Sequence, residues 1–161
     1  MLDNVKTALE RQFGRIDEQS DLVRFDFTDY YDPEMGENLQ RVWFGFVELR
    51  MPESLADCKR ATNALEDSWR DELGRRQVNL DPGLLTQHNL VLATTKNYAH
   101  RVYLRDGIYA EVTLRFQHGR FQPLEWTYPD YRSEAAQTFL ARVRAGYLNK
   151  LAASRPMRTQ G

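Results

Sequence analysis

The chain lacks most features that mark secreted, membrane-bound or nucleic-acid-binding proteins. Its 161 residues include a single cysteine, Cys58, which excludes an internal disulfide. No apolar run approaches the roughly 20 residues that span a bilayer, and no signal peptide is recognisable. The 22 basic and 23 acidic side chains nearly cancel, so no overall field attracts nucleic acid or an anionic membrane. We therefore expect a cytoplasmic protein without a membrane partner, in which any anion site is local.

Complete catalytic and metal-binding motifs are also missing. A P-loop needs a glycine-rich turn followed by lysine and serine or threonine, and no such run exists here. There is no nucleophile elbow, and one cysteine with three separated histidines offers no zinc-ligand spacing. An acidic stretch does not match the calcium loop and favours a solvated loop over a cation site; it contains Asp26, Asp29, Asp32, Glu34 and Glu37. The sequence thus predicts no metal and leaves the cofactor unknown.

Three amphipathic helices are predicted from apolar residues at three- and four-residue steps. The first ends at Gly14, the second runs from Pro52 to Gly74, and the last follows Ser133, a credible N-cap. Cys58 lies in the apolar stripe of the second helix. That position favours burial as a small hydrophobe over use as a nucleophile.

Alternating apolar residues predict the strands between these helices. Residues 22–28 read as a half-buried strand, and residues 90–95 as a buried one. Residues 41–49 are apolar on both faces, which is typical of a central, doubly covered strand. Residues 121–126 suit an edge strand, because Pro123 is tolerated there.

The hairpin around Gly107 has two possible registers. A two-residue turn would mix charged and apolar side chains on one face, whereas a three-residue loop with a left-handed Gly107 gives a clean apolar face. We take the second register. It sets Leu104 opposite Ile108, Val102 opposite Ala110, Tyr103 opposite Tyr109 and Arg101 opposite Glu111.

These elements predict an α+β fold with a mainly antiparallel sheet and helices packed on one face. Its core is α-β-β-α-β, extended by a β-meander between residues 90 and 126, and it is ferredoxin-like in part. Residues 1–152 are expected to form one domain. Residues 153–161 are expected to form a flexible C-terminal tail.

Polar residues interrupt good strand sequence between residues 79 and 116, and such local conflicts are expected at functional sites. Candidate ligand-binding residues come from this stretch and from residues 127–131. They are Asn79, Asp81, Thr94, Thr95, Lys96, Asn97, Tyr98, Arg101, Tyr128 and Asp130. If the protein is an enzyme, Asp81 or His100 is the candidate base. Lys96 and His100 also have structural interpretations. Lys96 could form an ion pair with Asp81, Asp29 or Asp130, and His100 could be a hydrogen-bonded group at the rim of the apolar face.

Four segments resemble a bacterial and archaeal family described as domain of unknown function 4416, whose members are sometimes labelled GTP-binding proteins. The segments are residues 28–36, 79–83, 93–101 with 109–114, and 127–131. The missing P-loop excludes a classical GTPase, and Tyr98 stands where the guanine-reading loop needs an aspartate. The resemblance also implies an apolar strand ahead of the first helix. Without it, Phe25, Phe27, Val42 or Phe44 would be poorly covered, or an edge unpaired, which favours a homodimer.

Three functions compete on this evidence. The first is a pocket for a small anionic ligand, such as a phosphorylated compound. In this pocket Lys96 and Arg101 supply charge and tyrosines form the walls. The second is a module for RNA or single-stranded nucleic acid; its stacking residues would be Tyr98, Tyr103, Tyr109, Tyr128 and Tyr131, and its phosphate contacts Arg75, Arg76, Lys96 and Arg101. The third is an assembly subunit that binds protein through an aromatic face. The near-neutral charge disfavours nucleic acid.

Overall fold

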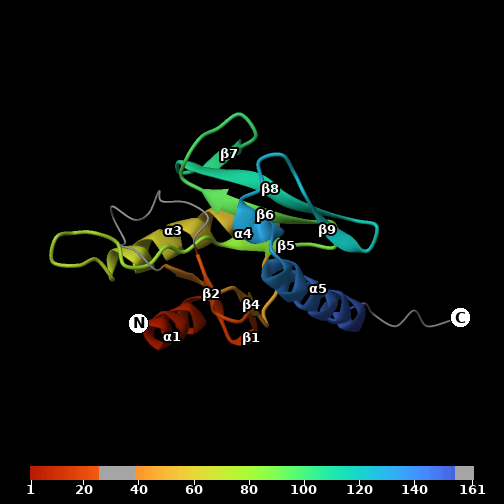
Figure 1. Cartoon of the computed structure of the whole chain (residues 1–161), viewed down its shortest axis with the longest axis horizontal. Helices are drawn as coiled ribbons and strands as arrows, with labels where there is room; N and C mark the ends of the chain where they lie inside the picture. The colour runs from red at the N-terminus through yellow and green to blue at the C-terminus, as the bar shows by residue number, and fades with distance from the viewer. Residues whose placement is uncertain (26–38, 155–161) are drawn as a thin grey trace, which may run out of the picture.

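The computed structural model describes residues 1–25 and 39–154, and the structural statements below concern these residues. The fold is α+β, and every strand pairing in this part of the chain is antiparallel (Figure 1). The helices are α1 (Leu2–Phe13), α3 (Leu55–Asp67), α4 (Pro129–Arg132) and α5 (Glu134–Ser154), with a 3-10 turn η1 (Pro52–Ser54). The strands are β1 (Ile16–Gln19), β2 (Val23–Arg24), β3 (Gln40–Arg41), β4 (Phe44–Phe46), β5 (Gly83–Leu85), β6 (Asn89–Thr94), β7 (Val102–Arg105), β8 (Ile108–Gln117) and β9 (Arg120–Pro123).

Strands from the second half of the chain form a five-stranded sheet. Its order is β5-β6-β8-β7, and β9 also pairs with β8. Ala110 pairs with Ala93 of β6 and with Val102 of β7, so β6 and β7 lie on opposite edges of β8. Strands β7, β8 and β9 follow one another as hairpins, as the predicted meander requires.

The predicted central strand at residues 41–49 is wrong. Those residues form β3 and β4, which pair with β2 and β1 as the two arms of an N-terminal hairpin outside the larger sheet. The apolar character on both sides has another cause. Trp43 packs on Tyr131 and Phe139, whereas Phe44 and Phe46 pack in the cluster of α1. Because no described strand of the hairpin joins the larger sheet, the ferredoxin-like expectation gains no support.

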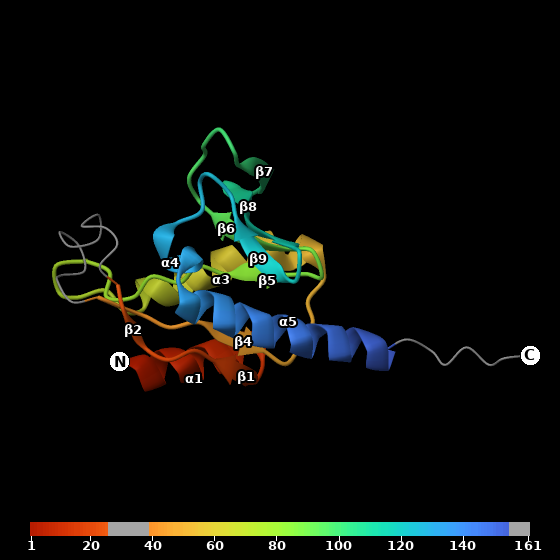
Figure 2. The ribbon, with the colours of Figure 1, turned by 45° about the vertical axis from the view of Figure 1, so that its right-hand side comes forward.

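Helices cover both faces of the five-stranded sheet. Successive side chains of a strand point to opposite faces, and those of β6 divide between two apolar clusters. Leu90 and Leu92 pack with residues of α5, whereas Val91 and Ala93 pack with Leu55 of α3. The expectation of helices on one face is therefore wrong. Both views place the five-stranded sheet and α1 at opposite ends of the molecule, with α3 between them and β1 beside α1 (Figures 1 and 2).

The β7–β8 hairpin uses the other register at its tip. Asp106 and Gly107 both have positive φ, of 54° and 75°, which makes a two-residue turn and pairs Arg105 with Ile108 instead of Leu104 with Ile108. An irregularity between Tyr103 and Arg105 then shifts the register back. The predicted pairs Val102 with Ala110 and Tyr103 with Tyr109 are confirmed.

The helix boundaries differ from the prediction mainly in α3. It ends at Asp67 rather than near Gly74, and Leu73 beyond it is 77% exposed. The N-cap Ser133 is confirmed, because its hydroxyl accepts the Ala136 N–H at 3.2 Å. Helix α5 continues to Ser154, so Ala153 is helical rather than part of a tail. Cys58 is half-buried in the cluster of α1, as predicted for a small hydrophobe.

Candidate functional site

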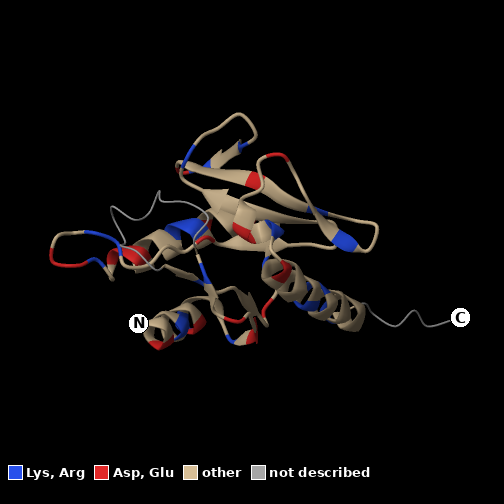
Figure 3. Ribbon diagram, viewed as in Figure 1, with Lys and Arg blue, Asp and Glu red and all other residues tan. Residues whose placement is uncertain are grey.

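Glu111 is the centre of a polar cluster on β8, and it is the one acidic residue of that strand. Acidic residues are red in Figure 3. The Glu111 side chain is 3% exposed. One oxygen, Oε2, lies 3.0 Å from His100 Nε2 and accepts a 2.8 Å hydrogen bond from Arg101 Nε. The Thr113 hydroxyl lies 3.4 Å from the other oxygen. We call Glu111, His100, Arg101 and Thr113 the Glu111 cluster.

Arg101 stays a cation in this cluster. Burial opposes its charged form, but the hydrogen bond to Glu111 and the charge of that carboxylate outweigh burial and raise the pKa of the guanidinium. Its Nη1 also donates to the Lys96 carbonyl at 3.1 Å, and the nearby Tyr128 side chain further raises the pKa of the guanidinium. The guanidinium therefore holds the base of the loop that follows β6.

That loop, residues 95–100, presents main-chain donors. Strand β6 ends at Thr94, whose hydroxyl accepts the Lys96 N–H at 3.2 Å. At the other end Arg101 N–H donates to the Tyr98 carbonyl at 3.0 Å. Between these contacts, the N–H groups of residues 97–100 donate to no acceptor in the described part of the chain. Unpaired N–H groups beside cationic side chains favour an anion.

Aromatic side chains surround the loop. The His100 ring is stacked on Trp126, with centroids 4.7 Å apart and 9° between the planes, and Tyr98 meets His100 edge-on at 5.3 Å. Trp126 is fixed by its indole N–H, which donates to the Val112 carbonyl at 2.9 Å. Tyr98 is 68% exposed and Tyr128 54%. Their rings are available to a ligand or a partner.

A second polar group, the buried charge network, lies between α3, the segment before β5, β3 and α4. Lys59, Glu66 and Asp130 are its buried members, Asp81 lies at its exposed rim, and Arg41, Arg76 and Asn79 are half-buried. Lys59 Nζ donates to the Leu80 carbonyl at 2.7 Å and lies 3.4 Å from Asp81 Oδ1 and 3.9 Å from Glu66 Oε1. Basic and acidic side chains alternate through this network, so its charges largely neutralise one another.

Burial affects the pKa values of two acids in the network. It raises the pKa of Glu66, although the Leu80 N–H bond and the nearby Lys59 charge act in the opposite direction. It likewise raises the pKa of Asp130, against the opposing charge of Arg41. Both carboxyl groups therefore hold their protons more tightly than exposed acids do.

The structure separates the predicted site residues into these two groups. Lys96, Asn97, Tyr98 and the two threonines lie in or beside the exposed loop, next to Arg101, His100 and Tyr128, whereas Asn79, Asp81 and Asp130 belong to the buried charge network. Two of the proposed partners of Lys96, Asp81 and Asp130, pair with Lys59 or Arg41. The third, Asp29, lies outside the described residues, as do the other acids of the predicted acidic loop.

Sequence reasoning missed four residues that organise these groups: Arg41, Lys59, Glu66 and, as a site residue, Glu111. Lys59 and Glu66 are seven apart on α3 and face the interior with Thr62. A charged residue at helical spacing within a buried stripe was the available signal. For Glu111 the signal was the predicted position opposite Arg101, which the 2.8 Å contact confirms.

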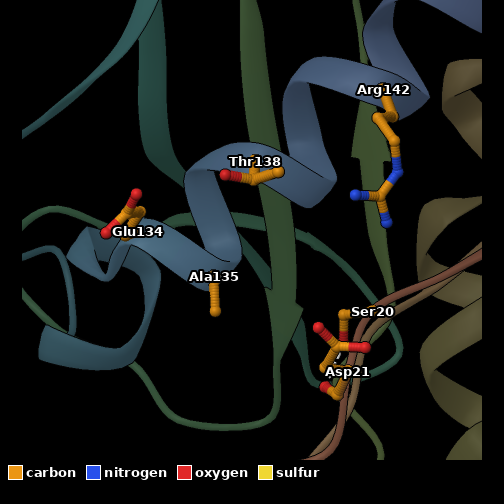
Figure 4. A pocket seen from close by; sticks show the side chains of 6 residues that line it. All are labelled: Ser20, Asp21, Glu134, Ala135, Thr138 and Arg142. Atoms are coloured by element: carbon orange, nitrogen blue, oxygen red, sulfur yellow. Dashed lines mark hydrogen bonds between the residues drawn. The ribbon is translucent and has the colours of Figure 1, made fainter.

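An open cleft of about 270 Å³ lies elsewhere, between the end of β1 and α5. Ser20 and Asp21 of the hairpin face Ala135, Thr138 and Arg142 of α5 across it (Figure 4). Arg142 is already bonded to Glu18 Oε2 at 2.9 Å and to the Gln19 carbonyl at 3.1 Å. None of the predicted site residues lines this cleft.

Comparison with known proteins places the chain in a family without assigning an activity. No curated protein and no solved structure matches it. No helix among the described residues is long and apolar enough to cross a membrane. The family model for the domain of unknown function DUF4416 matches residues 1–147. Because that match spans nearly the whole chain, the protein belongs to the DUF4416 family.

Proposed function

We propose that this protein binds a small anionic ligand, carrying a phosphate or a carboxylate, at the loop of residues 95–100. The observation that carries the proposal is the group of main-chain N–H donors at residues 97–100, held between Lys96 and a fixed, charged Arg101. Such donors stabilise negative charge without being charged themselves. Hydrogen bonds to an ionised group are also roughly twice as strong as neutral ones.

Side chains around the loop supply the remaining contacts. Lys96 and Asn97 are exposed next to these N–H groups, and Tyr98 and Tyr128 offer aromatic walls. Glu111 holds Arg101 from the interior side and partly offsets its charge. The proposed site is therefore selective for ligands that combine modest negative charge with an apolar or planar part. Asn79, Asp81 and Asp130 lie behind it in the buried charge network.

A thermal-shift screen tests this proposal. Inorganic phosphate, sugar phosphates, nucleotides and carboxylates are added to the wild type and to Lys96→Ala. The control is Lys150→Ala, because Lys150 pairs with Asp17 and lies outside the proposed site. At about 100 times the dissociation constant, a ligand stabilises the wild type by roughly 2.7 kcal/mol. That stabilisation should survive in Lys150→Ala and vanish in Lys96→Ala. A hit that is unchanged in Lys96→Ala removes the lysine from the site.

A second candidate function, assembly with another copy of this chain, is favoured by one observation. Large apolar side chains are exposed around the β7–β8 hairpin; they include Val102, Tyr103, Leu104 and Val112. Strand β7 is also an edge of the sheet, and edges invite pairing with another chain. The nucleic-acid alternative loses one of its stacking residues, because Tyr131 is buried.

Light scattering separates this candidate from a monomer. A dimer built on the hairpin should dissociate in Val102→Asp, because a charge then enters the exposed apolar surface. The control Leu73→Asp alters an equally exposed residue outside that surface. A monomeric wild type at all concentrations, or a dimer that Val102→Asp leaves intact, excludes this hairpin as the interface.

A further inference from the structure

Arg41 lies at the end of β3, where its guanidinium reaches carboxylates of two other elements. Nη1 lies 3.7 Å from Asp81 Oδ2, and Nη2 lies 3.2 Å from Asp130 Oδ2. The guanidinium carbon also lies 5.0 Å from the centre of the Phe25 ring. The N-terminal hairpin, the segment before β5 and α4 therefore meet at one side chain.

Arg41 supplies the charge that the buried Asp130 side chain needs as a partner. Asp130 is buried, and its Oδ2 accepts no hydrogen bond within the part of the chain that the structure describes. A buried carboxylate needs a charge partner or a hydrogen-bond donor, and Arg41 supplies the charge. The ion pair therefore holds the first turn of α4 against the hairpin.

Tyr128 follows one anchored residue, Thr127, and precedes another, Asp130, by two positions. On the sheet side, the Thr127 hydroxyl donates to the Thr113 carbonyl at 2.5 Å, while on the hairpin side Asp130 is paired with Arg41. The Tyr128 side chain lies near enough to Arg101 to raise the pKa of that guanidinium, although the tyrosine ring is largely exposed. These two anchors fix the backbone around Tyr128, and with it the direction of its Cα–Cβ bond, so they limit the rotamers that bring the side chain to Arg101.

We propose that Arg41 is a positioning residue for the anion site: by holding Asp130 it sets Tyr128 against Arg101. The inference rests on the proposed function, since it names a residue outside the loop on which the geometry of that site depends. It also gives the N-terminal hairpin a role in ligand binding.

Amide hydrogen exchange of the free protein tests the positioning role without any ligand. The variants are Arg41→Met, which removes the guanidinium, Arg41→Lys, which keeps a cation, and the control Arg11→Met on the exposed face of α1. Exchange in residues 128–133 should rise roughly tenfold in Arg41→Met, less in Arg41→Lys and not at all in Arg11→Met, while β6 and β8 stay protected. Unchanged exchange in that segment, or an equal rise in β6 and β8, overturns the proposal.

Asp130→Asn covers the case in which Arg41→Met does not fold. It removes the charge of Asp130 while keeping its shape and the contact between Arg41 and Asp81, so exchange should rise in residues 128–133 alone. Unchanged exchange in this variant also overturns the proposal.

Phosphate affinity adds a separate readout. If the wild type binds inorganic phosphate, Arg41→Met should weaken binding roughly tenfold, which corresponds to the loss of one oriented contact. Arg41→Lys should restore part of the lost affinity. A wild type that binds none of the screened anions refutes the proposed function. The exchange result then still decides the role of Arg41.

Discussion

The two polar groups of this protein contain similar residues in different settings. In the buried charge network, acids and bases alternate between α3, β3, α4 and the segment before β5, and Lys59 and Glu66 are almost fully enclosed. In the Glu111 cluster a single buried acid holds a histidine and an arginine at the base of an exposed loop. Among the described residues, the charges of the first group pair with one another. The second group ends in exposed aromatic rings and in N–H groups that meet no acceptor in the described part of the chain, so it offers donors to a ligand.

This difference predicts different consequences of substitution. Changes in the buried charge network should act mainly on stability, since its charges satisfy one another. Changes in the loop should act mainly on ligand binding, since its donors face outward. Glu111 belongs to both categories, because it is buried and also positions Arg101.

The largest expected effect is that of Lys59→Met. It removes the donor to the Leu80 carbonyl and to Asp81 and the cation that lies 3.9 Å from the buried Glu66, and breaking a buried pair from one side costs about 3–5 kcal/mol. Urea unfolding measures the loss. Arg60→Met is the matched control, because the neighbouring Arg60 makes an exposed pair with Asp106 that is worth at most about 1 kcal/mol. Equal losses in the two variants would show that the network is not a buried structural unit.

Glu111→Gln should have the next largest effect. The amide keeps the shape of the side chain but leaves Arg101 buried beside a neutral group, and hydrogen bonds to charged groups contribute about 1.5–3 kcal/mol. Unlike Lys59→Met, it should also weaken phosphate binding, because Arg101 loses its anchor. Denaturant unfolding and phosphate titration of the same preparation measure both quantities. Normal phosphate affinity in a destabilised Glu111→Gln would separate the cluster from the site.

Glu66→Gln should change the pH dependence of stability. Burial raises the pKa of Glu66 above its ordinary value of 4.5, so the folded state holds the proton more tightly than the unfolded state. The contribution of this carboxyl to the free energy of unfolding is then fully present below pH 4.5 and is lost as pH rises through the raised pKa. The stability difference between wild type and Glu66→Gln should fall over that window. A difference that rises with pH would mean that the pKa is lowered; the exposed Glu134→Gln serves as the control.

The smallest effect on stability is expected for Tyr98→Ala. Its ring is exposed and contacts His100 edge-on, so the free energy of unfolding should change by no more than about 0.5 kcal/mol. Affinity for a ligand with a planar group should fall, whereas affinity for inorganic phosphate should stay the same. A large loss of stability would place Tyr98 among the structural residues.

The sequence predicted the parts of the fold that depend on local periodicity. The first helix, the strand at residues 90–95, the cap at Ser133 and most of the β7–β8 register follow from patterns that neighbouring residues establish. Residues 41–49 were misplaced, because burial on both faces of a strand does not reveal whether strands or helices cover it. The pairing partner is a long-range property.

The candidate site was predicted in the same uneven way. Its loop was visible as polar residues at a strand end, and the Arg101–Glu111 contact followed from the hairpin register. The placement of Asn79, Asp81 and Asp130 was not visible, because it depends on Lys59 and Arg41 from distant elements. A charged side chain in an apolar helical stripe is ordinarily assigned to the surface. Lys59 instead reaches a main-chain carbonyl and two carboxylates inside the protein.

The main-chain N–H groups of residues 97–100 are the proposed anion-binding groups. An NMR titration of the wild type with inorganic phosphate tests this binding directly, because each amide reports its own hydrogen bond. We expect saturable shifts of the amides of residues 97–100, absent in Lys96→Ala, with little change in the amides near Lys59 and Glu66. Shifts confined to the buried charge network, or no saturable shift at residues 97–100, would contradict it.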